Sequence, residues 1–444
     1  MRGRIGRKRL QSGQVAIGEM GWGILLALVF LAVGCEKPSI ENIEAWKGTV
    51  KGPARLESTV ESSGVEPALR ARAAIALTDI GKGDRVDALL QSMETEDRGP
   101  LVAALIAAHG EVLKVGGDKA SAARDGLFGL RAYAGERELE TLDTLLVAAI
   151  GSQLKLSGQL SGSHSLAKIV EAVGARAAPV LLELLQTPSE NPSEIAGLLA
   201  RVGDDKTRAA ASDALVKSVR GRATVSPGMW ESLGMLGGPS ATAFLQETVK
   251  ANKEDSAVRA AQALQLRPHP ELGPFAMAVA NDPRMNGSVR DEMFGLAESC
   301  CGDSVVPGLG VVIGTTREDM VRYRAYEAAI TAGGARAIVP TLEAFPVKLT
   351  FKVEDVQDFL VKDIEKLAGR KDGKAPVIAA LVAGLGSASP LCRMVALMAL
   401  EKLGSGEESA AVKALEADKA MLPGFSGGSV GEVARRVSAK LASL

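Results

Sequence analysis

The sequence has few of the residues that build most catalytic and cofactor sites. Its 444 residues include 3 histidines and 4 cysteines, and only 3% of them are aromatic. The small aromatic content argues against a large β-sheet core, in which aromatic side chains are enriched, and against an aromatic-lined ligand pocket. Hydrophobic residues make up 46% and charged residues 24% of the chain, which is typical of a folded protein and not of a disordered one.

Motifs of known catalytic and cofactor chemistry are also missing. The chain has no H-E-x-x-H zinc motif, no Walker phosphate loop, no dinucleotide fingerprint and no C-x-x-C-H haem attachment. The aspartates at 84, 87, 204 and 205 lack the alternating spacing and closing glutamate of a calcium loop. His109, His164 and His269 are predicted to be structural or solvent-facing. We therefore predict a protein that is not an enzyme and holds no cofactor or metal.

The first 35 residues have the pattern of a bacterial lipoprotein signal. Five basic residues precede an unbroken apolar run of ten residues, 24–33. That run is too short to span a bilayer, which takes about 20 apolar residues, but it matches the h-region of a signal peptide. The sequence LAVGC, which ends at Cys35, then resembles a lipobox, in which a lipidated cysteine becomes the mature N-terminus. An ordinary secretory signal with an incidental cysteine is the alternative.

Lipidation at Cys35 would determine where the protein resides and what charge it carries. The acyl chains would hold it firmly in a membrane, because each buried CH₂ contributes about 0.8 kcal/mol. An aspartate directly after the lipidated cysteine would resemble a signal for retention in the inner membrane. Here Glu36 follows Cys35, so we expect the protein to be anchored at the periplasmic face of the outer membrane. The mature chain would carry 47 basic and 52 acidic side chains, a net charge of −5, without a basic block. Nucleic acid is therefore not an expected partner.

Short amphipathic patterns separated by glycine repeat along most of the chain. In residues 320–346, apolar residues at spacings of three and four from Val321 onward predict one helix, which Gly333 and Gly334 end. A second apolar stripe follows, with Pro340 in its first turn, where a missing N–H costs little. Neither helix is long enough to be stable alone in water, so each must bury its apolar face against a neighbouring unit.

The spacing of these units is typical of a repeat protein. Glycines that end the first helix of a pair lie 29 to 36 residues apart, for example at 174 and 203 and at 333 and 369. The chain resembles the HEAT-repeat superfamily, in particular the short variant shared with phycobilin lyases. The resemblance is carried by Val258-Arg259, Val289-Arg290 and Val321-Arg322 near the starts of first helices, and by Pro179, Pro307, Pro340 and Pro376 near the starts of second helices.

The resemblance covers most of residues 53–444 and implies an all-α fold. In that fold, antiparallel helix pairs stack into a right-handed α-solenoid, a superhelix of the HEAT or armadillo type. Residues 1–34 are predicted to be a signal peptide, and residues 35–52 a lipidated N-terminus and polar tether. Trp46 is expected to cover the exposed end of the first pair, because terminal repeats need capping. Residues 151–163, which are rich in serine and glycine, are predicted to be an irregular stretch within the array.

Arg259, Arg290 and Arg322 are predicted to occupy equivalent positions of three units. We expect them to form a ladder of ion pairs with carboxylates of neighbouring units. The alternative is a basic strip on the concave face that meets an acidic partner.

Three cysteines remain if Cys35 is lipidated. Cys300 and Cys301 end an apolar helix pattern and are predicted to be small core residues; a vicinal or long-range disulfide, involving Cys392 in the second case, is the alternative. A metal site is not expected, because no histidine or second cysteine pair lies at ligand spacing.

These features favour a membrane-anchored, non-catalytic protein-interaction scaffold of the bacterial cell envelope. A solenoid offers a long surface along which a protein partner can bind. Two alternatives belong to other classes. One is a structural envelope protein with a spacing role, and the other is an accessory enzyme of the bilin-lyase type, which only the family resemblance suggests.

Overall fold

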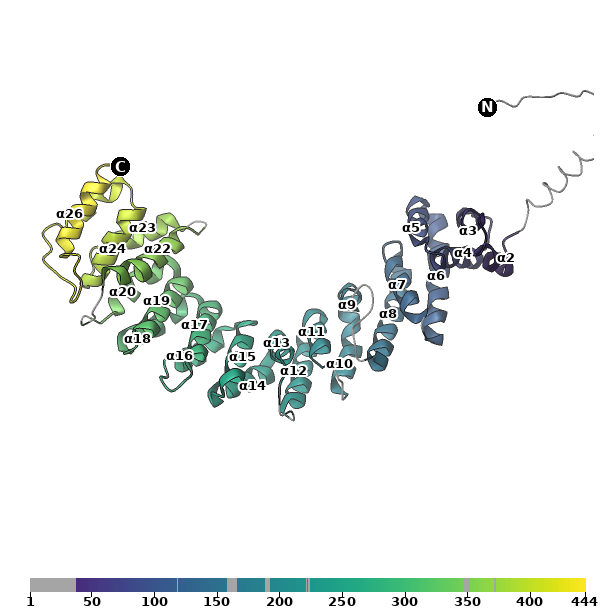
Figure 1. Cartoon of the computed structure of the whole chain (residues 1–444), viewed down its shortest axis with the longest axis horizontal. Coiled ribbons are helices and arrows are strands. Elements are labelled where there is room, and N and C mark those ends of the chain that lie inside the picture. Colours follow the sequence, from purple (N-terminus) through teal and green to yellow (C-terminus); the bar gives the residue numbers. More distant parts are fainter. Residues whose placement is uncertain are drawn as a thin grey trace, which may run out of the picture. The chain divides into compact units, whose positions relative to one another are not determined.

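The computed structural model describes residues 37–444, except 118, 158–165, 188–191, 221, 223, 347, 349–351 and 371–372. The predicted signal peptide, Cys35 and His164 lie outside the described residues. Within the part of the chain that is described, all regular structure is helical and no β-strand occurs (Figure 1). The prediction of an all-α fold is confirmed.

The chain divides into two compact units, residues 1–150 with 162–164 and residues 151–161 with 165–444. The helices described in the first unit are α2 (Ile40–Trp46), α3 (Gly52–Glu61), α4 (Pro67–Asp79), α5 (Gly83–Ser92), α6 (Thr95–Val115), α7 (Lys119–Leu130) and α8 (Glu136–Ser157), whose last turns cross the division.

The second unit begins with α9 (Leu166–Val173), η1 (Gly174–Ala177), α10 (Ala178–Gln186), α11 (Pro192–Val202), α12 (Asp205–Arg220), α13 (Pro227–Leu236), α14 (Gly238–Ala251), α15 (Glu254–Gln265), η2 (Pro270–Leu272), α16 (Gly273–Ala280), α17 (Gly287–Cys301), η3 (Gly302–Val305) and α18 (Val306–Thr315). It continues with α19 (Asp319–Gly333), η4 (Gly334–Ala337), α20 (Ile338–Ala344), α21 (Val353–Asp355), η5 (Val356–Val361), α22 (Lys362–Ala368), α23 (Lys374–Gly384), α24 (Pro390–Leu403), η6 (Gly406–Glu408), α25 (Ser409–Lys413) and α26 (Val430–Leu441).

The residues predicted to form a polar tether contain a helix. α2 starts at Ser39, whose hydroxyl accepts a hydrogen bond from the Asn42 amide at 3.2 Å, and it packs on α3 and α4. Ile43 and Trp46 supply its apolar face and are 0% and 4% exposed. The structure therefore places Trp46 inside the first unit, with the Arg55 guanidinium 5.6 Å from its ring centroid.

Two helices of the first unit continue through residues that commonly end helices. α6 continues through Pro100 and Gly110, and a Cβ on Gly110 would lie 3.1 Å from a methyl carbon of Leu145 in α8. Gly110 therefore permits a close approach and does not end the helix. α8 reaches Ser157, well into the stretch predicted to be irregular from residue 151.

Helices of the second unit contact their neighbours in two regular series. The first helix of each pair packs on the first helix of the next, in the order α9, α11, α13, α15, α17, α19, α22, α24 and α26 (Figure 1). Second helices contact one another in the same way from α10 to α12 and α14, and from α18 to α20 and α23. Each helix thereby buries the apolar face that it could not bury alone.

Glycine and proline mark the connections within several pairs. Gly174, Gly302 and Gly334 follow a first helix with φ of 66°, 53° and 59°, a left-handed conformation that other residues adopt at a steric cost. Each of these glycines opens a short 3₁₀ turn that leads into the second helix. Pro179 and Pro307 lie in the first turn of those helices, where no N–H is needed.

Residues 353–368 are helical throughout and contain a π-helical segment, η5. Tyr326 of α19 is fully buried, and its hydroxyl donates a hydrogen bond to the Leu360 carbonyl of η5 at 2.9 Å. Insertions of this kind bend or widen a helix locally. Here the tyrosine satisfies a backbone carbonyl of the irregular turn.

Residues Gly287–Thr315 are long and apolar enough to cross a membrane by length and composition. In the structure they are α17, η3 and α18, a helix pair of the array, and 44% of the apolar window is buried. Buried helices in the core of a protein can have the same length and apolar composition as membrane-spanning helices.

Candidate functional site

Of the three arginines predicted to form a ladder, Arg290 and Arg322 are buried between helices. Arg290 and Arg322 are each 5% exposed, and each lies three residues after the start of its helix, at Gly287 and Asp319. Their Nε atoms donate hydrogen bonds to carbonyls in the last turn of the preceding helix, to Ala280 at 2.9 Å and to Ile313 at 3.0 Å. A cation at a helix C-terminus is favoured there by the unpaired carbonyls and the helix dipole.

The carboxylate partners of these arginines differ. Arg290 donates from Nη1 to both carboxylate oxygens of Glu318 in the next pair, at 2.9 and 3.1 Å. Arg322 instead pairs with Asp319 of its own helix and donates to the Thr316 carbonyl. Both guanidinium groups are thus occupied inside the array.

Arg259 does not share this position, contrary to the prediction. Its helix α15 begins at Glu254, so Ala257 stands where the other two helices have arginine. Arg259 lies two residues further on and is exposed. The shared Val-Arg dipeptide therefore does not mark the same position in α15 as in α17 and α19.

Two further arginines, Arg70 and Arg393, do share the position. They lie three residues after Pro67 and Pro390, which start α4 and α24. Arg70 Nε donates to the Val60 carbonyl of α3 at 2.8 Å, and Arg393 Nη1 donates to the Ser387 carbonyl at 2.6 Å. An arginine at this distance from a helix start is the sequence signal that would have identified them.

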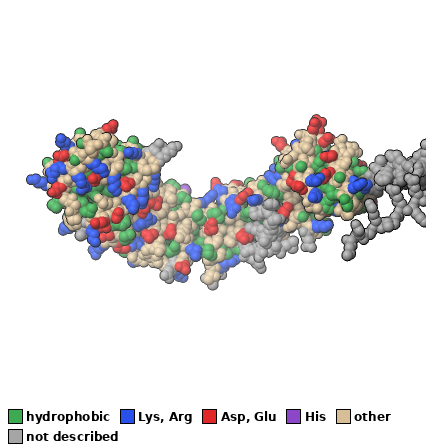
Figure 2. All heavy atoms as spheres, turned by 45° about the horizontal axis from the view of Figure 1, so that its top comes forward, with side chains coloured by type: hydrophobic (Ala, Val, Ile, Leu, Met, Phe, Trp, Pro, Cys, Tyr) green, Lys and Arg blue, Asp and Glu red, His purple; other side chains and the backbone are tan. Residues whose placement is uncertain are grey.

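Ion pairs between neighbouring first helices do occur, through other residues. Arg201 pairs with Glu171 at 2.7 Å, Lys402 with Glu365 at 2.6 Å, and Arg436 with Glu401 at 3.2 Å. All of these pairs are partly exposed, so each contributes roughly 0–1 kcal/mol. Figure 2 shows basic and acidic side chains interspersed on the visible face.

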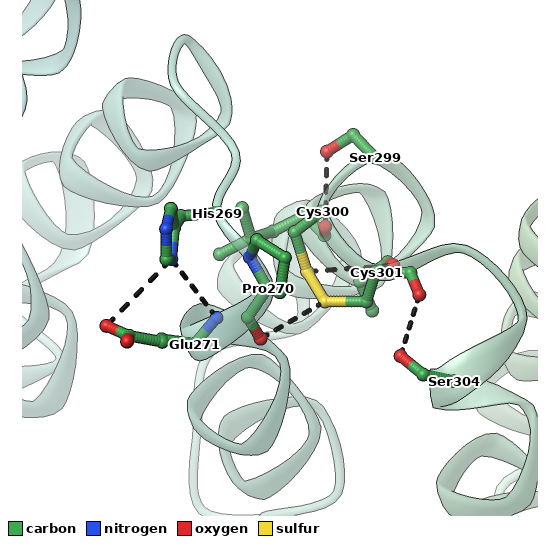
Figure 3. Close-up of a disulfide and its surroundings, with 9 residues drawn as sticks. His269, Pro270, Glu271, Ser299, Cys300, Cys301 and Ser304 are labelled. Carbon is green, nitrogen blue, oxygen red and sulfur yellow. Dashed lines mark hydrogen bonds and ion pairs between the residues drawn. A yellow bond between two sulfur atoms is a disulfide. The ribbon is translucent and has the colours of Figure 1, made fainter.

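Cys300 and Cys301 form a vicinal disulfide at the end of α17 (Figure 3). The structure shows the alternative of a vicinal bridge in place of two separate small core residues. Cys300 is 8% exposed, whereas Cys301 is only partly buried. Sγ of Cys301 lies 3.6 Å from the Pro270 carbonyl oxygen of η2, so the bridge touches the preceding helix pair.

Gly273 makes room for this bridge. A Cβ on Gly273 would lie 2.8 Å from Sγ of Cys301, so a larger residue could not occupy the first position of α16 without displacing the sulfur. Chemically, the bridge can accept two electrons and two protons from a reducing dithiol to give two thiols.

Cys392 is the free cysteine of the described residues. It is fully buried in α24, and burial raises the pKa of its thiol to about 11. A thiol of this kind is a weak nucleophile, because the thiolate is the reactive form. The structure supports a core role for Cys392.

The two described histidines have different surroundings. His269 precedes η2, and its Nδ1 accepts a hydrogen bond from the Glu271 amide at 3.3 Å, with Glu271 Oε2 at 3.9 Å (Figure 3). It is exposed and acts as a local cap. His109 lies inside the first unit, where burial lowers the pKa of its imidazole and the charge of Asp79 partly opposes that effect.

The glycine-rich stretch before α26 contains two G-x-S-x-G sequences, centred on Ser426 and Ser429. In hydrolases this motif places a serine between a strand and a helix. Here Ser429 caps the N-terminus of α26: its hydroxyl accepts a hydrogen bond from the Glu432 amide at 3.3 Å, and its backbone amide donates one to the Glu432 carboxylate at 2.7 Å. This is a capping box, and it gives Ser429 a structural role.

No group of three or more His, Cys, Asp or Glu side chains in the described part of the chain is placed to hold a metal ion. Comparison of the sequence with protein-family models and with curated proteins finds no match to either.

Proposed function

We propose that the chain is a lipid-anchored α-solenoid of the HEAT type, and that it serves as a protein-interaction scaffold in the bacterial cell envelope. The observation that carries the proposal is the double series of contacts, first helix to first helix and second helix to second helix, in the second unit. Stacked helix pairs produce this pattern, and their exposed faces then form extended surfaces suited to protein partners.

Membrane attachment through Cys35 is part of the same proposal. Its support is the basic segment, the ten-residue apolar run and the small residue before Cys35. The outer membrane is the proposed site, because Glu36 and not aspartate follows the cysteine.

The aromatic pair formed by half-buried Tyr323 and exposed Phe359 supports a role in protein contact. The two rings stack across neighbouring helices, α19 and η5, with centroids 4.6 Å apart, and Phe359 is 36% exposed. Met320, three residues before Tyr323 on α19, is 64% exposed. Large exposed apolar side chains that gather on one surface are typical of interaction sites.

Crosslinking capture from the native membrane tests the proposal. We expect the wild-type chain to be recovered with membranes and with a reproducible protein partner, and Cys35→Ala to lose the membrane association. Recovery of no reproducible partner would count against the scaffold, and self-association in analytical ultracentrifugation would favour the spacing role. Arg259→Glu tests the basic-strip interpretation, since loss of the captured partner with unchanged melting would support it.

A further inference from the structure

A hollow of about 390 Å³ lies among α4, α5, α6 and α7 in the first unit. Ligand sites in proteins usually have volumes of about 300–1,000 Å³, so the hollow can hold a small organic molecule. Most of its wall is apolar and is made by Ala74, Ile75, Val86, Leu90, Leu105 and Leu130. Except for Ile75, these side chains are at most 8% exposed, so the wall belongs to the core of the unit.

His109 is the polar group that the core brings to this wall. Its ring lies directly over Gly126, because a Cβ on Gly126 would be 2.8 Å from both Cε1 and Nε2. The ring forms no hydrogen bond within the described residues, and its nitrogens are not among the fully buried polar atoms that lack a partner. They are therefore accessible to solvent, and a molecule in the hollow can supply a hydrogen-bond partner.

The charge state of His109 restricts the ligand. Burial lowers the pKa of the imidazole, so the ring is neutral at pH 7 and offers one N–H donor and one acceptor nitrogen. Asp87 and Asp125 also line the hollow, whereas its lining residues include no lysine or arginine. Asp125 is paired with Arg124 at 2.8 Å. The remaining negative charge disfavours an anion.

Tyr133 connects the two sides of the hollow. Its hydroxyl donates to the Asp87 carbonyl and accepts from Gln91 Nε2, both at 3.5 Å. Asp87 and Gln91 belong to α5, and Tyr133 follows α7. These contacts link α5 to the residues after α7 on either side of the hollow.

We propose that this hollow binds a small, mostly apolar molecule that is uncharged or cationic and that places a hydrogen-bonding group on His109. The proposal is independent of the scaffold function, since it concerns the first unit alone. Anionic amphiphiles such as fatty acids are disfavoured by the Asp87 carboxylate at the wall.

Two fluorescent probes that differ by one charge test the ligand class on the purified full chain. N-Phenyl-1-naphthylamine is neutral, apolar and carries one N–H, whereas 1-anilinonaphthalene-8-sulfonate adds a sulfonate to nearly the same body. We expect saturable binding of the neutral probe, and binding of the sulfonate weaker by about tenfold or more. Absence of saturable binding of the neutral probe, or equal or tighter binding of the sulfonate, would overturn the proposal.

Two glycines of the first unit provide matched variants that place the probe in the hollow. A Cβ on Gly126 would overlap the His109 ring and must displace it, whereas a Cβ on Gly99, which does not line the hollow, meets nothing within 4 Å. We expect Gly126→Ala to weaken binding of the neutral probe by about tenfold, and Gly99→Ala to change it by less than about twofold. Equal affinities of the two variants would refute the site.

Histidine NMR gives a readout that does not depend on probe fluorescence. The chain has three histidines, so the ring resonances of His109 can be assigned by their loss in His109→Gln. The neutral probe should shift the His109 resonances and leave those of His269 in place. Unchanged His109 resonances at saturating probe would overturn the proposal.

Discussion

Replacing Arg290 by alanine removes a buried guanidinium that connects three helices. The side chain belongs to α17, its Nε bonds the last carbonyl of α16 at Ala280, and its Nη1 bonds Glu318, the residue that precedes α19. Only 5% of Arg290 is exposed. The variant therefore leaves the Ala280 carbonyl without its donor in a site that water reaches poorly.

The magnitude follows from these contacts. A hydrogen bond from a charged donor contributes about 1.5–3 kcal/mol. The side chain of Glu318 is 51% exposed, so its ion pair adds only about 0.2–1 kcal/mol. The free energy of local unfolding around α16 to α19 should fall by about 2–4 kcal/mol, which corresponds to amide exchange roughly 30 to 1,000 times faster.

Hydrogen exchange measured by mass spectrometry is the suitable assay, because a chain with two compact units does not always unfold in one step. Peptides from α16 to α19 should lose protection in Arg290→Ala, while peptides from α3 and α4 should not change. Arg259→Ala is the matched control, since an exposed arginine in the neighbouring helix should change stability by at most about 0.5 kcal/mol. Equal loss of protection in the two variants would refute the capping argument.

Three other predictions concern single residues. Hydrogen bonds from Arg284 lower the pKa of Asp282 from 3.8 to about 2. The stabilising effect of the carboxylate is therefore present above about pH 4 and is lost as the pH falls through about 2. The difference in stability between wild type and Asp282→Asn, measured by urea unfolding, should shrink over that range, and a constant difference would contradict the assignment. Cys392, with its pKa raised to about 11, should react with iodoacetamide at pH 8 far more slowly in the folded than in the denatured chain, as residue-resolved mass spectrometry can show; similar rates would exclude a buried thiol. Gly334→Ala should destabilise by about 1–2 kcal/mol because of its φ of 59°, whereas Gly287→Ala, whose Cβ meets nothing within 4 Å, should leave the melting temperature nearly unchanged; equal shifts would refute the backbone argument.

The glycines show how far local sequence patterns reach. Gly174, Gly302 and Gly334 end helices in the left-handed conformation, as the interruption of each apolar stripe predicts. Gly369 and Gly404 also follow helices, but with φ of −75° and −65°, so any small or polar residue could stand there as far as the backbone angle is concerned. The helix ends are predictable because apolar periodicity is a local property, whereas the backbone angle at each end is not.

Features that depend on several helices cannot be predicted from a local sequence pattern. Arg259 and Arg290 both follow valine, which predicts equivalent positions, but the capping position is measured from the first residue of the helix, which the dipeptide does not reveal. The hollow at His109 draws its wall from α4, α5, α6 and α7, and no period in the sequence relates those residues. The helix α2 was missed because only Ile43 and Trp46 of it are buried, too few to make a stripe.

The bond between Cys300 and Cys301 joins residues that are adjacent in the chain. In the chain-entropy account, a disulfide stabilises a fold in proportion to the logarithm of the segment that it closes. A crosslink between neighbours encloses no such segment, so it hardly restricts the unfolded polypeptide. Reduction of this bond should therefore leave the stability of the fold almost unchanged. It should alter only the surface beside Pro270, where the disulfide would be replaced by two thiols that can form hydrogen bonds.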